Sequence, residues 1–208
     1  MFLFFDDQIE NIRDVQTAFP SSICVLIDPR PVERDLREFE GNPYYQKMPM
    51  NRGFHEEHMG IVTKNPIIFD WDKTLSVVEG IHMPKGNYTF EDIGMPLEAV
   101  CHVILGGHAR IALLKSFFKR TKVVIVTNNP SACPISQTPY VFGDDTTCYN
   151  RPQFLRLIRF IIPTFQEKDL IASHMYHGIK SVALKDYFKK GKRKTRLFRL
   201  YGVSDLLS

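Results

Sequence analysis

The chain lacks most of the features that mark specialised classes of protein. It has only four cysteines, and their spacing matches neither a zinc site nor a disulfide framework, which favours a reducing compartment. No run of about 18 apolar residues occurs, so we expect no transmembrane segment. The opening MFLFFDD has no basic start and soon reaches two acids, which makes it a poor secretory signal. The net charge of +4 is too small by itself to indicate a nucleic-acid-binding protein.

The composition of the chain and its apolar runs predict one folded domain covering residues 1–208. Hydrophobic residues make up 44% of the chain and charged residues 24%, which argues against disorder. Five short runs are mostly apolar throughout, as is typical of strands covered on both faces in a parallel sheet. These runs are residues 2–5, 23–27, 66–69, 123–126 and 170–172.

Helical patterns separate these runs. Apolar residues repeat at intervals of three or four within residues 9–19, 111–118 and 154–161, and a last helix is expected at about residues 179–190. Strands that alternate with helices predict an α/β doubly wound fold, Rossmann-like, with about five parallel strands.

Two proline-containing stretches fall outside this pattern. Residues 29–65 are predicted to form a long connection with one helix near residues 33–40, and residues 128–151 to form a loop. Connections of this length are uncommon in compact domains and are often functional.

Polar side chains follow four of the predicted strands. The carboxyl ends of parallel strands meet at one edge of the sheet, where sites form in open α/β folds. We therefore expect a shared site built from Asp6, Asp7, Asp70, Asp72, Thr127, Asn128 and Lys180.

This combination of groups suits phosphoryl transfer. Crowded carboxylates repel one another unless a cation neutralises them, and oxygen ligands select a hard ion such as Mg²⁺. One aspartate can attack phosphorus, while a second acid two residues further on protonates the leaving oxygen. Lys180 lies near a helix N-terminus, where the helix dipole disfavours a cation, so an anionic partner is expected beside it.

The sequences around these residues resemble the motifs of the haloacid dehalogenase superfamily of aspartate phosphatases. FDWDKTL at residues 69–75 matches the first motif, DxDx[TV]. VVIVTNN at residues 123–129 resembles the second motif, and YHGIKSVALKDYF at residues 176–188 resembles the third. The opening FFDDQIENIRDV at residues 4–15 resembles the fourth, acidic motif, and it is most similar to the eukaryotic magnesium-dependent phosphatase branch. A weaker similarity is to secreted effector phosphatases of bacterial pathogens.

The resemblance implies a catalytic role for four of the residues. Asp70 is expected to attack phosphorus and to form an aspartyl-phosphate. Asp72 is expected to act first as general acid and then as general base on water. Thr127 and Lys180 are expected to hold the phosphate group.

The resemblance also implies a magnesium site. Its expected ligands are Asp70, the backbone carbonyl group of Asp72, and Asp7, with Asp6 as a supporting neighbour. The alternative for Asp6 and Asp7 is that they merely cap the helix that follows them.

The order of the motifs departs from that of the family, because the fourth motif comes first. A circular permutation explains this order, with residues 29–65 as the new connection and the chain ends close together. The rival for the fourth motif is Asp144 with Asp145. Only 17 residues separate Thr127 from Asp144, too few for the intervening elements, and they contain no lysine.

Other patterns have simpler interpretations. Cys24 to Arg30 has the C-x5-R spacing of cysteine-dependent phosphatases, but it has no glycine and reads as a strand with a buried cysteine. His55 to His58 lacks the HExxH spacing of a metal site and reads as a polar turn. His174 and His177 flank the third motif as surface or structural residues.

The substrate is inferred from what surrounds the motifs. Residues 75–108 are too few for a large cap, so the site is expected to be open to a phosphorylated protein or peptide, with phosphotyrosine the first choice. Asn128 and Trp71 are the expected additional substrate contacts, because an aromatic ring can stack on a phenyl phosphate. Three further residues are expected to contact substrate at the rim of the site: His82, Tyr88 and Phe90. For each of them the alternative is that the side chain packs in the core.

Three alternatives stay open. The basic segment at residues 185–208 favours a nucleic-acid 3′-phosphate as substrate. The simpler interpretation of this segment is a solvated surface with no role in binding. A small sugar phosphate is a further possible substrate. A catalytically idle domain that binds phosphorylated partners is the non-enzymatic alternative. The expected location is the cytoplasm or, for a secreted effector, the host cytoplasm.

Overall fold

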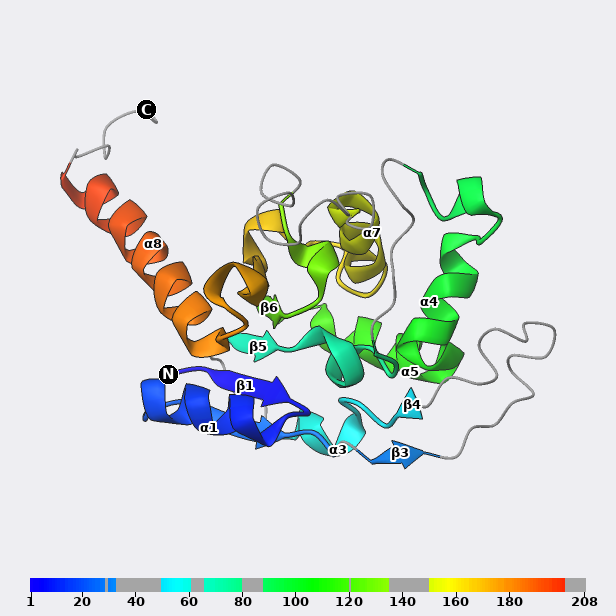
Figure 1. Ribbon diagram of the computed structural model, residues 1–208, viewed down its shortest axis with the longest axis horizontal. Helices are drawn as coiled ribbons and strands as arrows, with labels where there is room; N and C mark the ends of the chain where they lie inside the picture. The colour runs from blue at the N-terminus through cyan, green and yellow to red at the C-terminus, as the bar shows by residue number, and fades with distance from the viewer. Residues whose placement is uncertain are drawn as a thin grey trace.

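The computed structural model describes residues 1–28, 30–32, 50–60, 66–79, 88–119, 121–134 and 150–200, with the backbone alone at 31–32 and 191–200. The chain forms an α/β fold around a five-stranded parallel sheet (Figure 1). The strands are β1 (Leu3–Asp6), β2 (Ile23–Leu26), β5 (Ile67–Phe69), β6 (Val123–Thr127) and β7 (Leu170–Ala172).

The order of the strands brings distant parts of the sequence together. The sheet runs β2-β1-β5-β6-β7, and every neighbouring pair is parallel. β1 therefore pairs with β5, with Phe5 opposite Phe69, although some 60 residues separate them. The carboxyl ends of β1, β5, β6 and β7 come out along one edge, which is the edge expected to carry the site.

Helices cover both faces of this sheet. One face packs against α4 (Leu97–Leu105), α5 (Gly107–Phe118) and α7 (Arg151–Ile161). The other face packs against α1 (Ile9–Ala18) and α8 (Lys180–Leu200). The doubly wound α/β architecture predicted from the sequence is confirmed at this level.

Strand residues alternate between the two cores. Phe5 and Phe69 belong to the larger cluster under α4, α5 and α7, whereas Phe4 and Ile68 belong to the cluster under α1 and α8. All four side chains are fully buried, and burial of each contributes about 1.5–3 kcal/mol relative to exposure. This is why the central strands read as unbroken apolar runs.

The edge strand β2 departs from that expectation. Ile23 is 40% exposed and Leu26 is 41% exposed, because β2 pairs with β1 on one side only in the described sheet. The prediction that this apolar run is covered on both faces was wrong for these two residues.

Three further elements differ from the predictions. The expected long connection at residues 29–65 holds a small antiparallel pair, β3 (Pro31–Val32) with β4 (Met50–Asn51), and the short helix α3 (Glu56–Met59). The helix expected at residues 33–40 lies outside the described residues. α8 continues ten residues beyond its predicted end and extends away from the body of the molecule (Figure 1).

The helix α4 was not predicted, since its sequence lay in the expected cap insertion. Its residues Val100, Cys101, Ile104 and Leu105 are buried in the larger core. A bend of 87° separates α4 from α5, at Gly106. Within the described ranges no single helix is long and apolar enough to cross a membrane, and only this bent pair reaches the required length and composition.

Candidate active site

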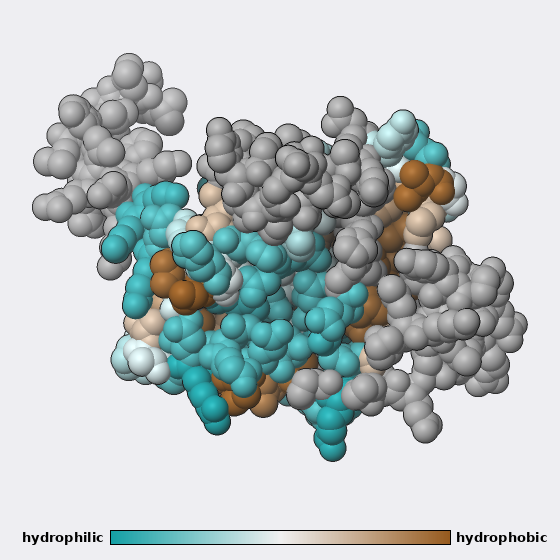
Figure 2. Space-filling model, viewed as in Figure 1, coloured by the Kyte–Doolittle hydropathy of each residue, from teal (hydrophilic) through white to brown (hydrophobic). Residues whose placement is uncertain are grey.

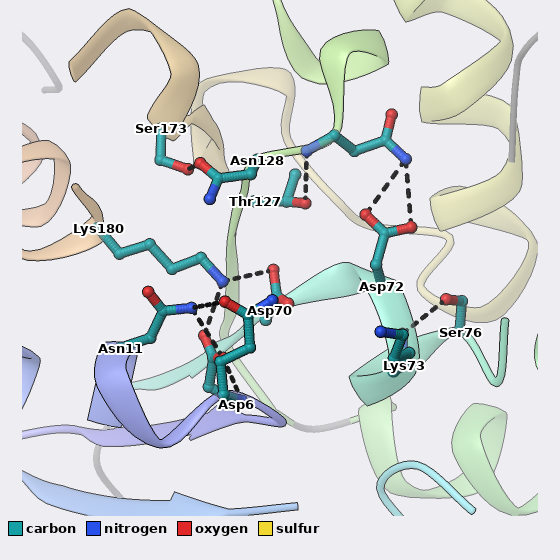
Figure 3. Close-up of polar contacts among 12 residues, drawn as sticks. Asp6, Asn11, Asp70, Asp72, Lys73, Ser76, Thr127, Asn128, Ser173 and Lys180 are labelled. Atoms are coloured by element: carbon teal, nitrogen blue, oxygen red, sulfur yellow. Dashed lines mark hydrogen bonds and ion pairs between the residues drawn. The ribbon is translucent and has the colours of Figure 1, made fainter. Parts of the chain in front are cut away.

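The predicted site residues converge at the carboxyl edge of the sheet. Asp6 is the last residue of β1, Asp70 follows β5, Thr127 ends β6, and Ser173 follows β7. Lys180 reaches the same place from the first turn of α8 (Figure 3). Neighbouring parallel strands thus assemble a cluster whose members are up to 174 residues apart.

A buried ammonium group lies at the centre of this cluster. Lys180 Nζ donates a hydrogen bond to Asp6 Oδ2 at 2.7 Å and lies 2.9 Å from Asp70 Oδ1. Burial acts to lower the pKa of Lys180, but the charges of Asp70 and Asp6 outweigh it, so the pKa is raised and the lysine stays charged. The side chains of all three residues are nearly inaccessible to solvent.

Asp6 is held from several sides. Its Oδ1 accepts hydrogen bonds from the backbone N–H of Gln8 at 2.9 Å and from the Asn11 side-chain amide at 3.0 Å. Its Oδ2 accepts the bond from Lys180. Asp6 therefore shapes the turn before α1 and anchors the lysine, but it does not cap the helix, because the N-cap residue is Gln8 and no side chain caps α1.

The cluster of carboxylates fits a cation. Oxygen atoms of Asp6, Asp7 and Asp70 all lie within 4.8 Å of one another, and all three residues are buried. Asp70 Oδ1, although near Lys180, accepts no hydrogen bond within the described structure. Asp6 is already occupied by its three donors, so Asp7 and Asp70 are the better placed direct ligands.

The electrostatics of this cluster point the same way. Burial, reinforced by the charge of Asp6, raises the pKa of Asp7 to about 6. Burial also raises the pKa of Asp70, although the ammonium of Lys180 opposes this shift. Three buried acids with one lysine carry an excess of negative charge, and a divalent cation would relieve it.

A tight turn follows Asp70. Residues Trp71–Leu75 form a π-type turn in which Asp72 and Lys73 leave helical geometry, and Lys73 has φ 56°. The backbone N–H of Lys73 donates to Ser76 Oγ at 3.2 Å and to the carbonyl oxygen of Val78 at 3.3 Å. The turn directs the Asp72 carboxylate toward the loop that follows β6 (Figure 3).

Arg110 fastens this turn to the rest of the fold. From α5 its guanidinium donates to the carbonyl oxygens of Leu75 at 2.7 Å, Leu105 and Phe54 at 2.9 Å, and Thr74 at 3.3 Å. Because the group is buried among carbonyl oxygens and not paired with an acid, its pKa is lowered to about 9 by burial. The arrangement ties together the nucleophile turn, the segment after β4 and the end of α4.

Polar groups at the end of β6 are oriented by their neighbours. Thr127 Oγ1 accepts a hydrogen bond from the backbone N–H of Asn129 at 3.0 Å, which leaves its proton for another acceptor. Asn128 Oδ1 accepts a bond from Ser173 Oγ at 2.5 Å, which sets the orientation of the Asn128 amide. Asn128 lies beside Lys180 in the same cluster (Figure 3).

The prediction that Trp71 contacts substrate is not supported by its position. The side chain is 1% exposed and packs edge-to-face against Phe154, with ring centroids 5.0 Å apart. The ring points into the core because the turn after Asp70 reverses the chain direction. Phe90 is also buried, whereas Tyr88 is 62% exposed and stays a candidate rim residue. His82 lies outside the described residues.

The structure adds three residues that the sequence patterns did not single out. Asn11 and Ser173 orient Asp6 and Asn128, and Asn129 donates from its amide to both carboxylate oxygens of Asp72 at 3.3 and 3.4 Å. Asn129 had a visible signal, since VVIVTNN places two amides after a strand. Asn11 lies within the FFDDQIENIRDV motif but was not assigned a role there, and Ser173 carries no comparable signal.

The rival motifs have other roles. Cys24 lies half-buried in β2, and burial raises the pKa of its thiol, while Arg30 is exposed and paired with Asp28 at 2.6 Å. This confirms the interpretation of the C-x5-R spacing as a strand. Asp144 and Asp145 lie outside the described residues.

Among the described histidines, none is grouped with the acid cluster. His55 precedes the short helix α3, where its backbone N–H donates to His58 Nδ1 at 3.2 Å and its ring pairs with Glu57. The only group of potential metal ligands in the described residues is the one formed by Asp6, Asp7 and Asp70.

The middle of the molecular face seen in Figure 2 is hydrophilic, and apolar residues form separate patches around it. This polar surface lies where Figure 1 shows the ends of β1 and β5 and the start of α8. The acid cluster therefore lies beneath a polar surface, as suits a charged ligand. Comparisons with protein-family models, with curated proteins and with solved structures find no match for this chain.

Proposed function

We propose that this protein is a Mg²⁺-dependent phosphomonoester hydrolase that acts through an aspartyl-phosphate on protein phosphotyrosine, and that its fold is a circularly permuted form of the haloacid dehalogenase fold. One observation carries the proposal: Lys180, Asp70 and the Asp6–Asp7 pair form one buried cluster at the carboxyl edge of the sheet. The adjacency of β1 and β5 supports the permutation, because it brings the acidic opening beside Asp70.

In the proposed first step, an Asp70 oxygen attacks phosphorus as the bond from phosphorus to the leaving oxygen breaks. Asp72 gives its proton to that leaving oxygen, so the alcohol departs neutral. Thr127 and Asn128 donate hydrogen bonds to the phosphate oxygens, and Lys180 offsets their charge. The product of this step is an aspartyl-phosphate, the mixed anhydride of the Asp70 carboxylate and phosphate.

In the second step, Asp72 takes a proton from water, whose oxygen attacks the same phosphorus. The bond between Asp70 and phosphorus breaks, inorganic phosphate leaves, and both aspartates return to their starting states. Asp7, Asp70 and the Asp72 carbonyl group would hold the magnesium ion, with Asp6 in support. When bound, the ion neutralises phosphate charge and steadies the geometry of attack.

Exposed apolar residues favour an aryl phosphate. Ile179 is 44% exposed next to Lys180, and Ile9 is 36% exposed two residues after Asp7. At the starts of α8 and α1 they offer apolar surface to a phenyl ring. Tyr88 is a further exposed aromatic residue.

The test compares wild type with Asp70→Asn on p-nitrophenyl phosphate, with Mg²⁺ and with a chelator. Hydrolysis by wild type in Mg²⁺ alone supports the proposal. Equal rates for both proteins would refute the mechanism, and absence of hydrolysis with retained binding of phosphorylated peptides would favour the idle binding domain.

One observation favours a second substrate class, the nucleic-acid 3′-phosphates. Lys185, Lys189 and Lys190 are all exposed on α8, the helix that begins at the site. A phosphotyrosine peptide and a 3′-phosphorylated oligonucleotide, compared at several salt concentrations, separate the two classes. Preference for the oligonucleotide with steep salt dependence would select the second.

A further inference from the structure

Asn129 is held at three points in the loop after β6. Its Oδ1 accepts a hydrogen bond from the backbone N–H of Ser131 at 3.0 Å, and its own N–H donates to Thr127 Oγ1 at 3.0 Å. Its Nδ2 faces Asp72, 3.3 Å from Oδ2 and 3.4 Å from Oδ1. Only 4% of the residue is exposed. The bond to Ser131 fixes which end of the amide points to Asp72.

The Asp72 carboxyl group receives this contact at a bend of the chain. The residue lies in the non-helical part of the Trp71–Leu75 turn, with φ −65° and ψ 131°, and its side chain is only partly buried. A contact shared by both carboxylate oxygens restricts rotation of the group about its last bond. Asn129 lies two residues after the end of β6 and its N–H is bonded to Thr127 Oγ1, so it also links the position of Asp72 to that of Thr127.

We propose that Asn129 is a positioning residue for the acid–base step: it holds the Asp72 carboxyl group in register with the Thr127 hydroxyl group, so that the leaving oxygen of a bound phosphate faces the acid. The inference rests on the proposed function. The proposed role of Asn129 is in the cleavage of the phosphate ester. The binding of the phosphate group is the proposed role of Thr127, Asn128 and Lys180.

The test separates positioning from local folding. Asn129→Ser and Asn129→Asp both keep an oxygen that can accept the bond from the Ser131 N–H, and both remove the amide donor to Asp72. Asn129→Ala removes the cap as well. The readout is kcat/KM, which reports the first chemical step, on p-nitrophenyl phosphate and on phenyl phosphate.

The two substrates differ in their need for an acid. The p-nitrophenolate ion leaves readily without protonation, whereas phenolate depends on it. We expect Asn129→Ser to lower kcat/KM for phenyl phosphate by about 10–100-fold, part of what general acid catalysis supplies, and to have a much smaller effect with p-nitrophenyl phosphate. In an Asp72→Asn background the same change should have no further effect.

The outcomes are distinct. Equal losses on both substrates, or undiminished losses in the Asp72→Asn background, would show that Asn129 has only a structural role and would overturn the inference. Retention of full activity on phenyl phosphate would overturn it as well. Wild type that hydrolyses neither substrate would instead refute the proposed function, and the inference with it.

Discussion

Lys180 and Asp6 are 174 positions apart in the chain, yet their charged atoms are 2.7 Å apart in the core of the site. Both side chains are at most 2% exposed. A charged pair this deep gains little net stability from its own attraction, but loss of one member leaves the other uncompensated. The pair therefore makes the stability of the fold depend on an intact site.

Replacement of Lys180 by methionine should destabilise the metal-free protein. We expect a loss of about 3–5 kcal/mol in the free energy of unfolding, because Asp6 and Asp70 are left buried without a counter-charge. Urea denaturation in a chelator measures it. Lys185→Met is the matched control on the same helix, since Lys185 is exposed and should cost less than about 0.5 kcal/mol.

Magnesium should partly rescue that variant. A divalent cation supplies the positive charge that Lys180→Met removes, so its addition should raise the melting temperature of the variant more than that of wild type. Equal increases in the melting temperatures of both proteins would contradict the prediction, because they would mean that the ion does not bind the acids that pair with Lys180.

Asp7 and Asp6 should differ in their effect on magnesium affinity. Asp7→Asn should abolish binding measurable by calorimetry, whereas Asp6→Asn should weaken it by about 10–100-fold, as expected for a supporting residue. Asp145→Asn is the control and should bind as wild type does. If Asp145→Asn lost the ion while Asp7→Asn kept it, the permuted order of motifs would be wrong.

The space between Gly53 and Arg110 is too small for a side chain at residue 53. Gly53 has φ +65°, and a Cβ there would lie 2.7 Å from Arg110 Nη2 and 2.8 Å from the Thr74 carbonyl oxygen. Gly53→Ala should therefore destabilise the fold by several kcal/mol and disturb the nucleophile turn. Gly60→Ala is the control, because φ is −65° and nothing lies within 4 Å. A neutral Gly53→Ala variant would show that Arg110 does not restrain the turn.

Trp71→Phe should separate a core role from a substrate role. The ring is buried against Phe154, so we expect a loss of about 1–3 kcal/mol in stability and an unchanged preference for aryl over alkyl phosphates. A KM that rises for aryl phosphates alone would restore the stacking role. Because Trp71 is the only tryptophan, the variant has no tryptophan fluorescence, so circular dichroism measures the unfolding of both proteins.

The site was largely predictable because each of its main residues lies at or just after a strand or at a helix start, where local sequence decides position. Asp70 and Thr127 were found in this way. The partner of Asp72 was not, because nothing local to residue 72 points to Asn129 in the loop after the neighbouring strand β6. Trp71 was proposed as a substrate contact because its neighbour Asp70 lies in the cluster, but sequence alone does not show that the indole ring is buried against Phe154.

In the fold, too, features set by local sequence were predicted and features set by tertiary contacts were not. Strands with continuous apolar runs were found almost to the residue, whereas α4 was missed because its sequence lay within the segment expected to form a cap. β2 has a strand-like sequence, but the exposure of its side chains depends on its position at the edge of the sheet. That position is determined by the order in which the strands pair, which the sequence of β2 does not reveal.

The parallel arrangement of β1 beside β5, with Lys180 arriving from α8, has a consequence for biosynthesis. β1 is synthesised some 60 residues before its partner β5, and the lysine that pairs with Asp6 is 174 residues away. Until α8 has been synthesised, the acids of β1 and β5 lack the ammonium group that pairs with them, which should delay the docking of β1 against β5.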